Sequence, residues 1–443
     1  MPAGVSGTNR ASTPHLFSSE EEAGTLTRSS IRINGEFGRL YHQFGGKFNS
    51  IALDCPLQEM AAGRPCPRAH CGVLRVTSTR KATGALALIL ALASSVPAFS
   101  QTQLGVNFTN GDRLSQSVQL TSLSELQAAG ANVIRIGLEP RNWGPPGVYD
   151  DSIALIKAAY ARGLSPIVIV PLQYPATAAR RSYNPAYPDI WAAYPLSQSD
   201  PTLFTSWFIP ILAQLEASGV VLAGLELGNE INSAPFNGDF PVPGQGNVFG
   251  DADLYSNSEA EVIAGGYRAY MLSLQALRQI RDASALNQAT PVISAGLSNT
   301  GAPRSGGVSV DGVAVDAVSI NATLDYLRAY GLDTTADSYG IHFYPNANAT
   351  SAQRYNDLAD NALTQCGKYG PSCTVTEWGF RLPKITCPLN DSSRYNLAYE
   401  ILTDVASWGS AVRSMIWFDW LSAQFGLYQC GAETATGHLV LGH

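Results

Sequence analysis

The chain has 443 residues, of which 45% are hydrophobic and 14% are charged. This composition provides for a large hydrophobic core and excludes a wholly disordered chain. The first hundred residues hold 10 of the 28 Lys and Arg and 6 of the 35 Asp and Glu, so the remainder has 18 basic against 29 acidic residues, a net charge of −11. An acidic domain of this kind is a poor partner for nucleic acid, and we expect none.

The beginning of the chain differs from the rest. Residues 1–78 are rich in Ser, Gly, Arg and Pro without a sustained hydrophobic period, which predicts a disordered leader of doubtful translation. Arg80-Lys81 then precedes an apolar run, Ala85 to Ala93, and small residues that end at Ser100. Such a pattern is typical of a signal peptide, here residues 79–100, and we therefore expect the true start codon to lie downstream of Met1. The alternative is a type II membrane anchor, although the run is short for a membrane span.

Four cysteines follow the predicted cleavage site: Cys366, Cys373, Cys387 and Cys430. An even number in an exported chain predicts two disulfides. Three pairings are possible, and we prefer Cys366 with Cys373 and Cys387 with Cys430. We expect a secreted or periplasmic monomer with no membrane contact after signal cleavage.

Residues 101–443 alternate apolar segments with amphipathic ones. The predicted strands are Leu104 to Phe108, Asn132 to Leu138, Ser165 to Leu172, Leu222 to Leu227, Pro291 to Gly296, Ser338 to Phe343, Cys373 to Glu377 and Ser414 to Phe418. The predicted helices are Ser122 to Ala129, Asp151 to Arg162, Pro201 to Ser218, Glu259 to Leu286, Asp316 to Tyr330, Ala352 to Tyr369 and Ser392 to Trp408.

Eight strand-helix units are the number that closes a parallel barrel, so we predict a (β/α)8 TIM barrel for this region. An open doubly wound sheet is the alternative, but no glycine-rich dinucleotide turn follows the first strand. Residues 434–443 make a poor helix, and the eighth helix is therefore expected to be short or missing.

Two buried strands end on a glutamate. The fourth is followed by Glu230, and the seventh carries Glu377. The carboxyl ends of barrel strands are where enzymes of this fold place their chemistry. Two carboxylates about 5 to 5.5 Å apart can cleave a glycosidic bond with retention. Arg135, on the second strand, would be buried and need an anion, so we expect it to pair with Glu377 and hold its pKa down.

Glu226 is an alternative candidate for the catalytic role of Glu230, because it lies four residues earlier and has the same parity on the strand. At about 3.3 Å per residue it lies some 13 Å deeper, so we expect a barrel-interior group paired with a buried donor. The loops from Gln173 to Asp200 and from Asn232 to Ser258 are long and rich in aromatic residues, which would suit the apolar faces of sugar rings. Packing of these aromatic residues against one another is the alternative.

Five motifs, in strand order, resemble those of clan A glycoside hydrolases, the retaining (β/α)8 group that includes family 5 cellulases and mannanases. They are Arg135, Asn229-Glu230, Gly340-Ile-His-Phe-Tyr344, Thr376-Glu377-Trp378-Gly379 and Trp417. The resemblance covers residues 104–428. It implies a barrel that hydrolyses O-glycosidic bonds of a polysaccharide or oligosaccharide. Ile231 stands where family 5 commonly has Pro.

The resemblance also implies roles for these residues. Glu230 would be the acid/base and Glu377 the nucleophile, while Asn229 would bind the sugar 2-hydroxyl. His342 and Tyr344 would hydrogen-bond around the nucleophile, and Trp417 would lie under the sugar at the cleavage point. Two further tryptophans, Trp143 and Trp378, are candidates for lining subsites.

Other chemistries have little support. After the predicted cleavage site only His342, His438 and His443 are histidines, and no His-Glu-x-x-His helix, Gly-x-Ser-x-Gly turn or phosphate loop occurs. We therefore expect a hydrolase with a carbohydrate substrate and no metal or organic cofactor. The alternatives are a transglycosylase with the same two glutamates and a non-catalytic carbohydrate-binding barrel.

Overall fold

The computed structural model describes residues 102–138, 149–302, 307–382 and 384–442. The predicted leader, the signal peptide and Trp143 lie outside these residues. No helix in the described part of the chain combines the length and the apolar character needed to cross a membrane.

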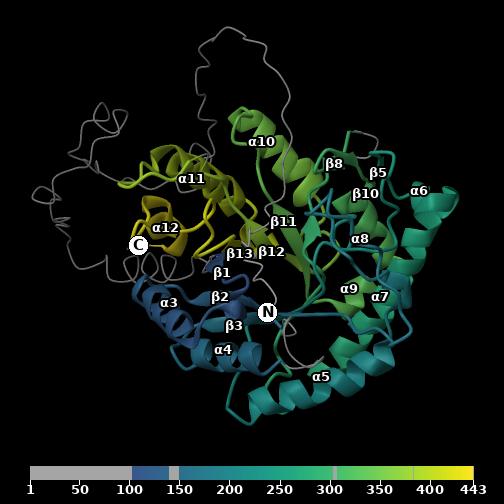
Figure 1. The fold of residues 1–443 in the computed structure, drawn as a ribbon, viewed down its shortest axis with the longest axis horizontal. Helices are drawn as coiled ribbons and strands as arrows, with labels where there is room; N and C mark the ends of the chain where they lie inside the picture. Colours follow the sequence, from purple (N-terminus) through teal and green to yellow (C-terminus); the bar gives the residue numbers. More distant parts are fainter. Residues whose placement is uncertain (1–101, 139–148, 303–306, 383, 443) are drawn as a thin grey trace, which may run out of the picture. The chain divides into compact units, whose positions relative to one another are not determined.

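Eight parallel strands form a closed ring with the helices around it (Figure 1). The order is β12-β13-β1-β2-β3-β4-β6-β11, and β11 pairs with β12 to close the ring. The predicted TIM barrel is confirmed, and an open sheet is excluded. The strands are β1 (Gln103–Asn107), β2 (Val133–Gly137), β3 (Ser165–Val170), β4 (Gly224–Leu227), β6 (Val292–Ile293), β11 (Ser338–Phe343), β12 (Ser372–Trp378) and β13 (Val412–Trp417).

The inside of the barrel is identified by residues that meet across it. Val133, Ile167, Ile293 and Ile416 come from β2, β3, β6 and β13, and they form a small buried cluster of their own. Side chains alternate between the two faces of a strand, so every second residue along these strands points inward. This parity determines which residues at the ends of β1 and β13 point into the barrel, whereas register shifts interrupt it in β12.

The fifth barrel strand is interrupted, whereas the sequence predicted one strand from Pro291 to Gly296. It consists of β6 and β7 (Leu297–Ser298), which both pair with β11. Between them, a Cβ on Gly296 would lie 2.1 Å from His342 Nε2 and 2.6 Å from Thr376 Oγ1. Only glycine therefore allows this backbone to pass so close to the two side chains.

The helices of the outer layer follow the strands with predictable starts. Asp200 caps α5 by accepting from the backbone N–H of Thr202 and Leu203, with Pro201 in the first turn. The main helices are α3 (Gln116–Ala128), α4 (Asp150–Tyr160), α5 (Pro201–Glu216), α7 (Ser258–Asp282), α8 (Ile320–Arg328), α10 (Ser351–Asp357), α11 (Ser392–Ala406) and α12 (Ala435–Leu441). The last of these has seven residues, so the expectation of a short eighth helix is confirmed.

Two predicted helices were too long. The segment from Asp316 begins instead with β10 (Ala317–Val318), which pairs with β5 (Val248–Phe249), and helix α8 begins only at Ile320. The predicted helix Ala352 to Tyr369 ends at Asp357 and continues as a π-helical turn, Leu358–Ala362. In both cases tertiary contacts override a local helical pattern.

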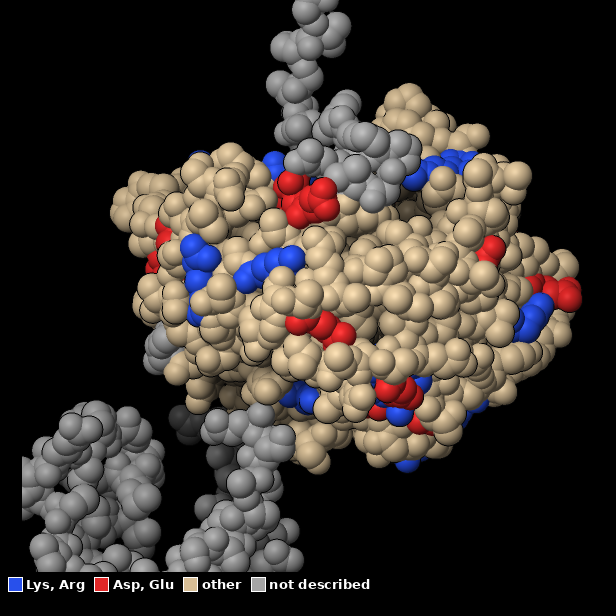
Figure 2. Space-filling model, turned by 90° about the horizontal axis from the view of Figure 1, so that it is seen from below, with Lys and Arg blue, Asp and Glu red and all other residues tan. Residues whose placement is uncertain are grey.

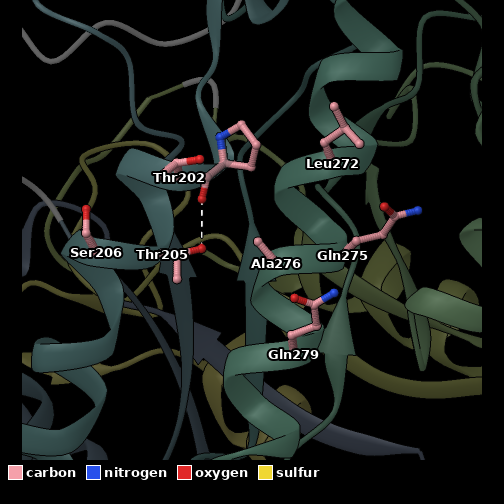
Figure 3. A pocket seen from close by; sticks show the side chains of 8 residues that line it. Thr202, Thr205, Ser206, Leu272, Gln275, Ala276 and Gln279 are labelled. Atoms are coloured by element: carbon pink, nitrogen blue, oxygen red, sulfur yellow. Dashed lines mark hydrogen bonds between the residues drawn. The ribbon is translucent and has the colours of Figure 1, made fainter.

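The remaining elements are short. They are α6 (Asp253–Ser256), α9 (Leu332–Thr335), the hairpins β8 (Ser309–Val310) with β9 (Val313–Ala314) and β14 (Tyr428–Gln429) with β15 (Ala432–Glu433), and 3-10 turns at Gly111–Arg113, Leu196–Gln198 and Gly409–Ala411. An open pocket lies between α5 and α7, lined in part by Thr202, Leu272 and Gln279 (Figure 3). All of its lining residues belong to α5 and α7 of the outer helix layer, and neither strand-end glutamate is among them.

Charged side chains are sparse on the face seen in Figure 2, and both signs are scattered over it. A nucleic-acid-binding face would concentrate Lys and Arg. This face has no such concentration.

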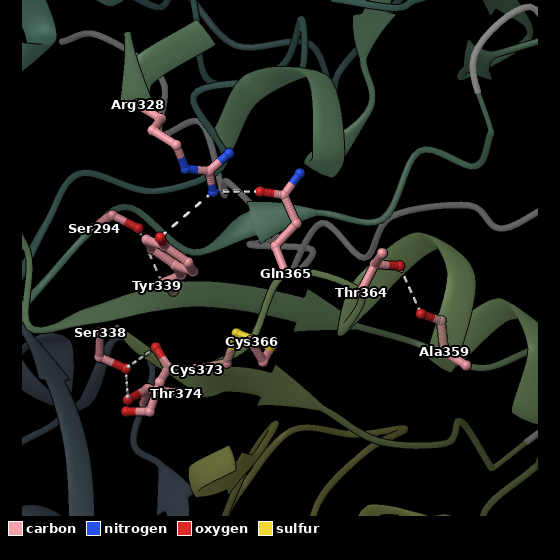
Figure 4. The surroundings of a disulfide bond; sticks show 12 residues. Ser294, Arg328, Ser338, Tyr339, Ala359, Thr364, Gln365, Cys366, Cys373 and Thr374 are labelled. Atoms are coloured by element: carbon pink, nitrogen blue, oxygen red, sulfur yellow. Dashed lines mark hydrogen bonds between the residues drawn. A yellow bond between two sulfur atoms is a disulfide. The ribbon is translucent and has the colours of Figure 1, made fainter. Parts of the chain in front are cut away.

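Both preferred disulfides are present, and they differ in environment. Cys366 and Cys373 are buried: Cys373 pairs with Tyr339 in the sheet, and Gln365, next to Cys366, accepts from Arg328 (Figure 4). Cys387 and Cys430 are exposed. The exposed bond joins residues 43 apart, which in the chain-entropy model contributes roughly 4 kcal/mol.

We expect a thiol reductant under native conditions to open Cys387–Cys430 first, because exchange needs access to sulfur. Alkylation followed by peptide mass spectrometry should label these two cysteines while Cys366 and Cys373 stay unlabelled. The melting temperature should fall on labelling. Equal labelling of both pairs would contradict this expectation.

Candidate active site

Glu230 and Glu377 lie at one mouth of the barrel. Glu230 lies shortly after the end of β4, and Glu377 is the second-to-last residue of β12. Their side chains are 14% and 12% exposed, so both are largely buried but still reach solvent. One carboxylate oxygen of each, together with a ring nitrogen of His342, lies within 4.8 Å of the others. Two acids far apart in sequence are therefore neighbours in space.

The backbone at Glu230 is unusual. Its φ is 43°, in the left-handed region that residues other than glycine rarely adopt. The conformation is held by the N–H of Glu230, which donates to the carbonyl of Gly296 at 2.8 Å, and by a turn in which Ser233 N–H donates to the Glu230 carbonyl. Strained backbone of this kind is concentrated at functional sites.

Arg135 is buried at the centre of the site. Its Nη1 donates to Glu377 Oε1 at 2.6 Å, as predicted from the sequence. Its Nε and Nη2 donate to the two oxygens of Glu226 at 2.6 and 3.1 Å, and Nη2 also donates to Asn229 Oδ1 at 3.1 Å. The expectation that Glu226 pairs with a buried donor is confirmed. The sequence did not indicate that this donor is Arg135 itself.

Three further side chains complete the surroundings of the two glutamates. Tyr344 Oη donates to Glu377 Oε2 at 2.6 Å. His342 Nδ1 lies 2.8 Å from Glu230 Oε1 and 3.5 Å from Glu377 Oε2, so it contacts both acids. Asn107, which the sequence reasoning missed, accepts from Arg135 Nη1 at 2.8 Å with its amide oxygen. Its position at the end of β1 was the signal that could have identified it.

These contacts set the charge of Glu377. Burial opposes its ionisation, but the facing charges of His342 and Arg135 and the hydrogen bonds from Tyr344 and Arg135 outweigh burial, so the pKa of Glu377 lies below its ordinary value. Burial alone would lower the pKa of His342, whereas the carboxylates of Glu377 and Glu230 raise it. Burial and Glu377 raise the pKa of Tyr344, which keeps its hydroxyl protonated.

Trp417 does not offer a face to a substrate. In the sheet it pairs with Val106, whereas the inward-facing residue on β1 is Asn107. Trp417 therefore points outward and is fully buried, with its indole N–H donating to the carbonyl of Phe425 at 2.8 Å. The expected position under the sugar is wrong. Trp378 is also fully buried, edge-on to Trp417, and supports the strand ends instead of lining a subsite.

The aromatic residue that does face the site is Phe418. It shares the parity of Ile416, which lies inside the barrel, and packs edge-on against Tyr344 with ring centroids 6.0 Å apart. Next to it Asp419 is buried, and burial, opposed by hydrogen bonds from Ser422 and assisted by the charge of Glu377, raises the pKa of Asp419 to about 7. Neither residue was singled out from the sequence, although the parity of Ile416 would have pointed to Phe418.

Glu230, His342 and Glu377 are also the one group of side chains, within the described ranges, whose ligand atoms are close enough together to hold a metal ion. The fourth neighbour is the guanidinium of Arg135, which donates to Glu377 at 2.6 Å and would repel a cation. Hydrogen bonding among these groups accounts for their proximity.

The sequence matches no family model and no curated protein. The chain is similar to solved structures of several carbohydrate-active enzymes. They include fungal beta-1,4-galactanases (13% identity, TM-score 0.47, 81% of this chain and 97% of that chain), a beta-mannanase from Streptomyces thermolilacinus (17%, 0.40, 77% and 89%) and a family 5 xyloglucanase from Paenibacillus pabuli (13%, 0.44, 77% and 98%). The strand pairing of this chain closes a (β/α)8 barrel, which is the fold that the resemblance to clan A glycoside hydrolases implied.

Proposed function

We propose that this chain is a retaining β-glycoside hydrolase that cleaves O-glycosidic bonds of a polysaccharide or oligosaccharide. The observation that supports the proposal is the approach of Glu230 and Glu377, in which one carboxylate oxygen of each residue lies within 4.8 Å of one oxygen of the other. Retaining enzymes have carboxyl groups about 5 to 5.5 Å apart, whereas inverting enzymes need roughly 6.5 to 9.5 Å to admit a water molecule. The geometry therefore favours a covalent intermediate.

In the first step Glu377 attacks the anomeric carbon while Glu230 gives its proton to the leaving oxygen. The bond to the leaving sugar breaks, and an ester forms between Glu377 and the remaining sugar. Glu377 suits this role because its low pKa keeps it ionised. In this mechanism Asn229, whose Oδ1 accepts from Arg135 Nη2 at 3.1 Å, binds the sugar 2-hydroxyl.

In the second step Glu230, now a carboxylate, takes a proton from water, which attacks the same carbon and releases Glu377. Two displacements restore the original configuration. His342, in contact with both acids, holds Glu230 in place through both steps. Both steps of the reaction use only these side chains and water.

Product stereochemistry tests the mechanism directly. Proton NMR of a β-linked oligosaccharide during the first minutes of hydrolysis should show the β-anomer as the first product. An α-anomer appearing first would contradict retention. Added acceptor sugars separate hydrolysis from transglycosylation, and failure to release phenol from any aryl glycoside would favour a carbohydrate-binding protein instead.

Export of this enzyme is also part of the proposal. The two disulfides are compatible with an oxidising compartment. A polymer substrate outside the cell would require such a location.

An exposed aromatic residue supports a substrate of several sugars. Trp191 is 42% exposed and packs edge-on against Phe236, with ring centroids 4.5 Å apart. Arg181 donates to the carbonyls of Trp191 and Ala234 at 3.0 and 2.6 Å. Because Ala234 is four residues from Glu230, the guanidinium fixes Trp191 to the loop that carries the acid.

We expect Trp191→Ala to raise KM for a long oligosaccharide by roughly 3- to 10-fold, which corresponds to losing the binding free energy of one aromatic contact. The kcat/KM for a small aryl glycoside should stay within twofold, because that substrate does not reach Trp191. Tyr399→Ala is the matched control, since Tyr399 is 57% exposed on α11. An equal loss on both substrates would mean that Trp191 only supports the loop.

A further inference from the structure

Arg135 donates two hydrogen bonds to Glu226 but only one to Glu377. The Nε and Nη2 side of the guanidinium meets both oxygens of Glu226, which is the two-point geometry of the strongest Arg–carboxylate pairs. Glu377 receives a single bond, from Nη1. The buried acid behind the site is thus the principal partner of the arginine that supports the nucleophile.

Glu226 is also fixed from a second direction. It is fully buried, and its Oε1 accepts from the N–H of Gly296 at 3.0 Å. The carbonyl of the same Gly296 holds the N–H of Glu230. One carboxylate therefore connects the arginine behind the nucleophile with the backbone that positions the acid/base.

We propose that Glu226 is a positioning residue for Arg135. It holds the guanidinium in one orientation and neutralises part of its charge. Glu377 therefore stays ionised but remains a good nucleophile. The inference rests on the proposed function. Without Glu226, the whole charge of Arg135 would act on Glu377. An anion stabilised to that degree is a weaker nucleophile, because the stabilisation is lost when its charge passes to the sugar.

Several groups act on Glu377 directly and contribute to its titration. Burial raises its pKa, whereas the charges of His342 and Arg135 and the hydrogen bonds from Tyr344 and Arg135 lower it. Three further titratable groups lie near Glu377 or Glu226. Glu230 contacts His342, burial and the charge of Glu377 raise the pKa of Asp419, and burial and the charge of Glu226 raise the pKa of Tyr270.

The test is the pH dependence of kcat/KM on an aryl β-glycoside, measured with Glu226→Gln and Tyr344→Phe. Loss of the negative charge at Glu226 should lower the pKa of Glu377 and move the acid limb down by about one pH unit. Loss of the Tyr344 hydrogen bond should raise the pKa of Glu377 and move the limb up. The plateau for Glu226→Gln should fall at least tenfold.

Glu226→Asp separates charge from position and serves if Glu226→Gln does not fold. Aspartate keeps the charge but is too short to hold both nitrogens of Arg135 and the N–H of Gly296. We expect an unmoved acid limb and a kcat/KM at least tenfold lower. Wild-type activity in Glu226→Asp, or an acid limb in folded Glu226→Gln that is unmoved or raised, would overturn the inference. A wild-type protein inactive on every glycoside would overturn the proposed function instead.

Discussion

Replacing Glu377 by Ala should abolish release of phenol from an aryl β-glycoside, with kcat falling on the order of 10⁴-fold or more, as when a covalent nucleophile is removed. No covalent intermediate can form without this carboxylate. Arg135 keeps both bonds to Glu226 in the variant, so the fold should persist. The measurement is kcat for wild type and variant, with circular dichroism to check folding.

A small anion provides the control for this variant. Azide can enter the space left by the Glu377 side chain and attack the anomeric carbon from the same side. It should restore turnover and give a glycosyl azide of inverted configuration. Full activity in folded Glu377→Ala without azide would show that the nucleophile has been misassigned.

Glu230→Gln should separate the two steps of the reaction by leaving group. A glycoside of a poor leaving group needs protonation and should lose about 10²- to 10⁴-fold, the usual contribution of general acid catalysis. A dinitrophenyl glycoside needs no proton, so its first step should survive while the second step slows. The expected observation is a burst of one phenol per enzyme and a glycosyl ester on Glu377 by mass spectrometry.

Leaving groups supply the internal control, because both substrates are tested on one variant. An equal loss on both would mean that Glu230→Gln damages the site generally. A variant that acts on the poor leaving group at the wild-type rate would remove Glu230 from the mechanism.

The barrel fold and the proximity of the two glutamates could be predicted because both follow from the local sequence pattern of the strands. Apolar runs in βα alternation identify strands, and the order of strands in a closed ring then brings the fourth and seventh together. The pairing of Arg135 with Glu377 followed from the cost of burying an unpaired charge. Disulfide pairing was a preference among three choices, and the structure has the preferred one.

The rest depends on register and close packing, which sequence alone does not give. The position of Trp417 was predicted from motif likeness, whereas its pairing with Val106 turns it outward and leaves Phe418 to face the site. The sharing of Arg135 between two acids requires knowing how far its side chain extends across the barrel. The need for glycine at residue 296 comes from His342 and Thr376, which lie far away in sequence.

The left-handed backbone at Glu230 has an evolutionary consequence. Glycine or asparagine would adopt φ = 43° with less strain, by on the order of 1 kcal/mol, so selection for stability alone would favour losing the glutamate. Relatives that have abandoned turnover should therefore carry one of those two residues here and melt at a higher temperature. In such a lineage, an increase in thermal stability would be the first consequence of losing activity.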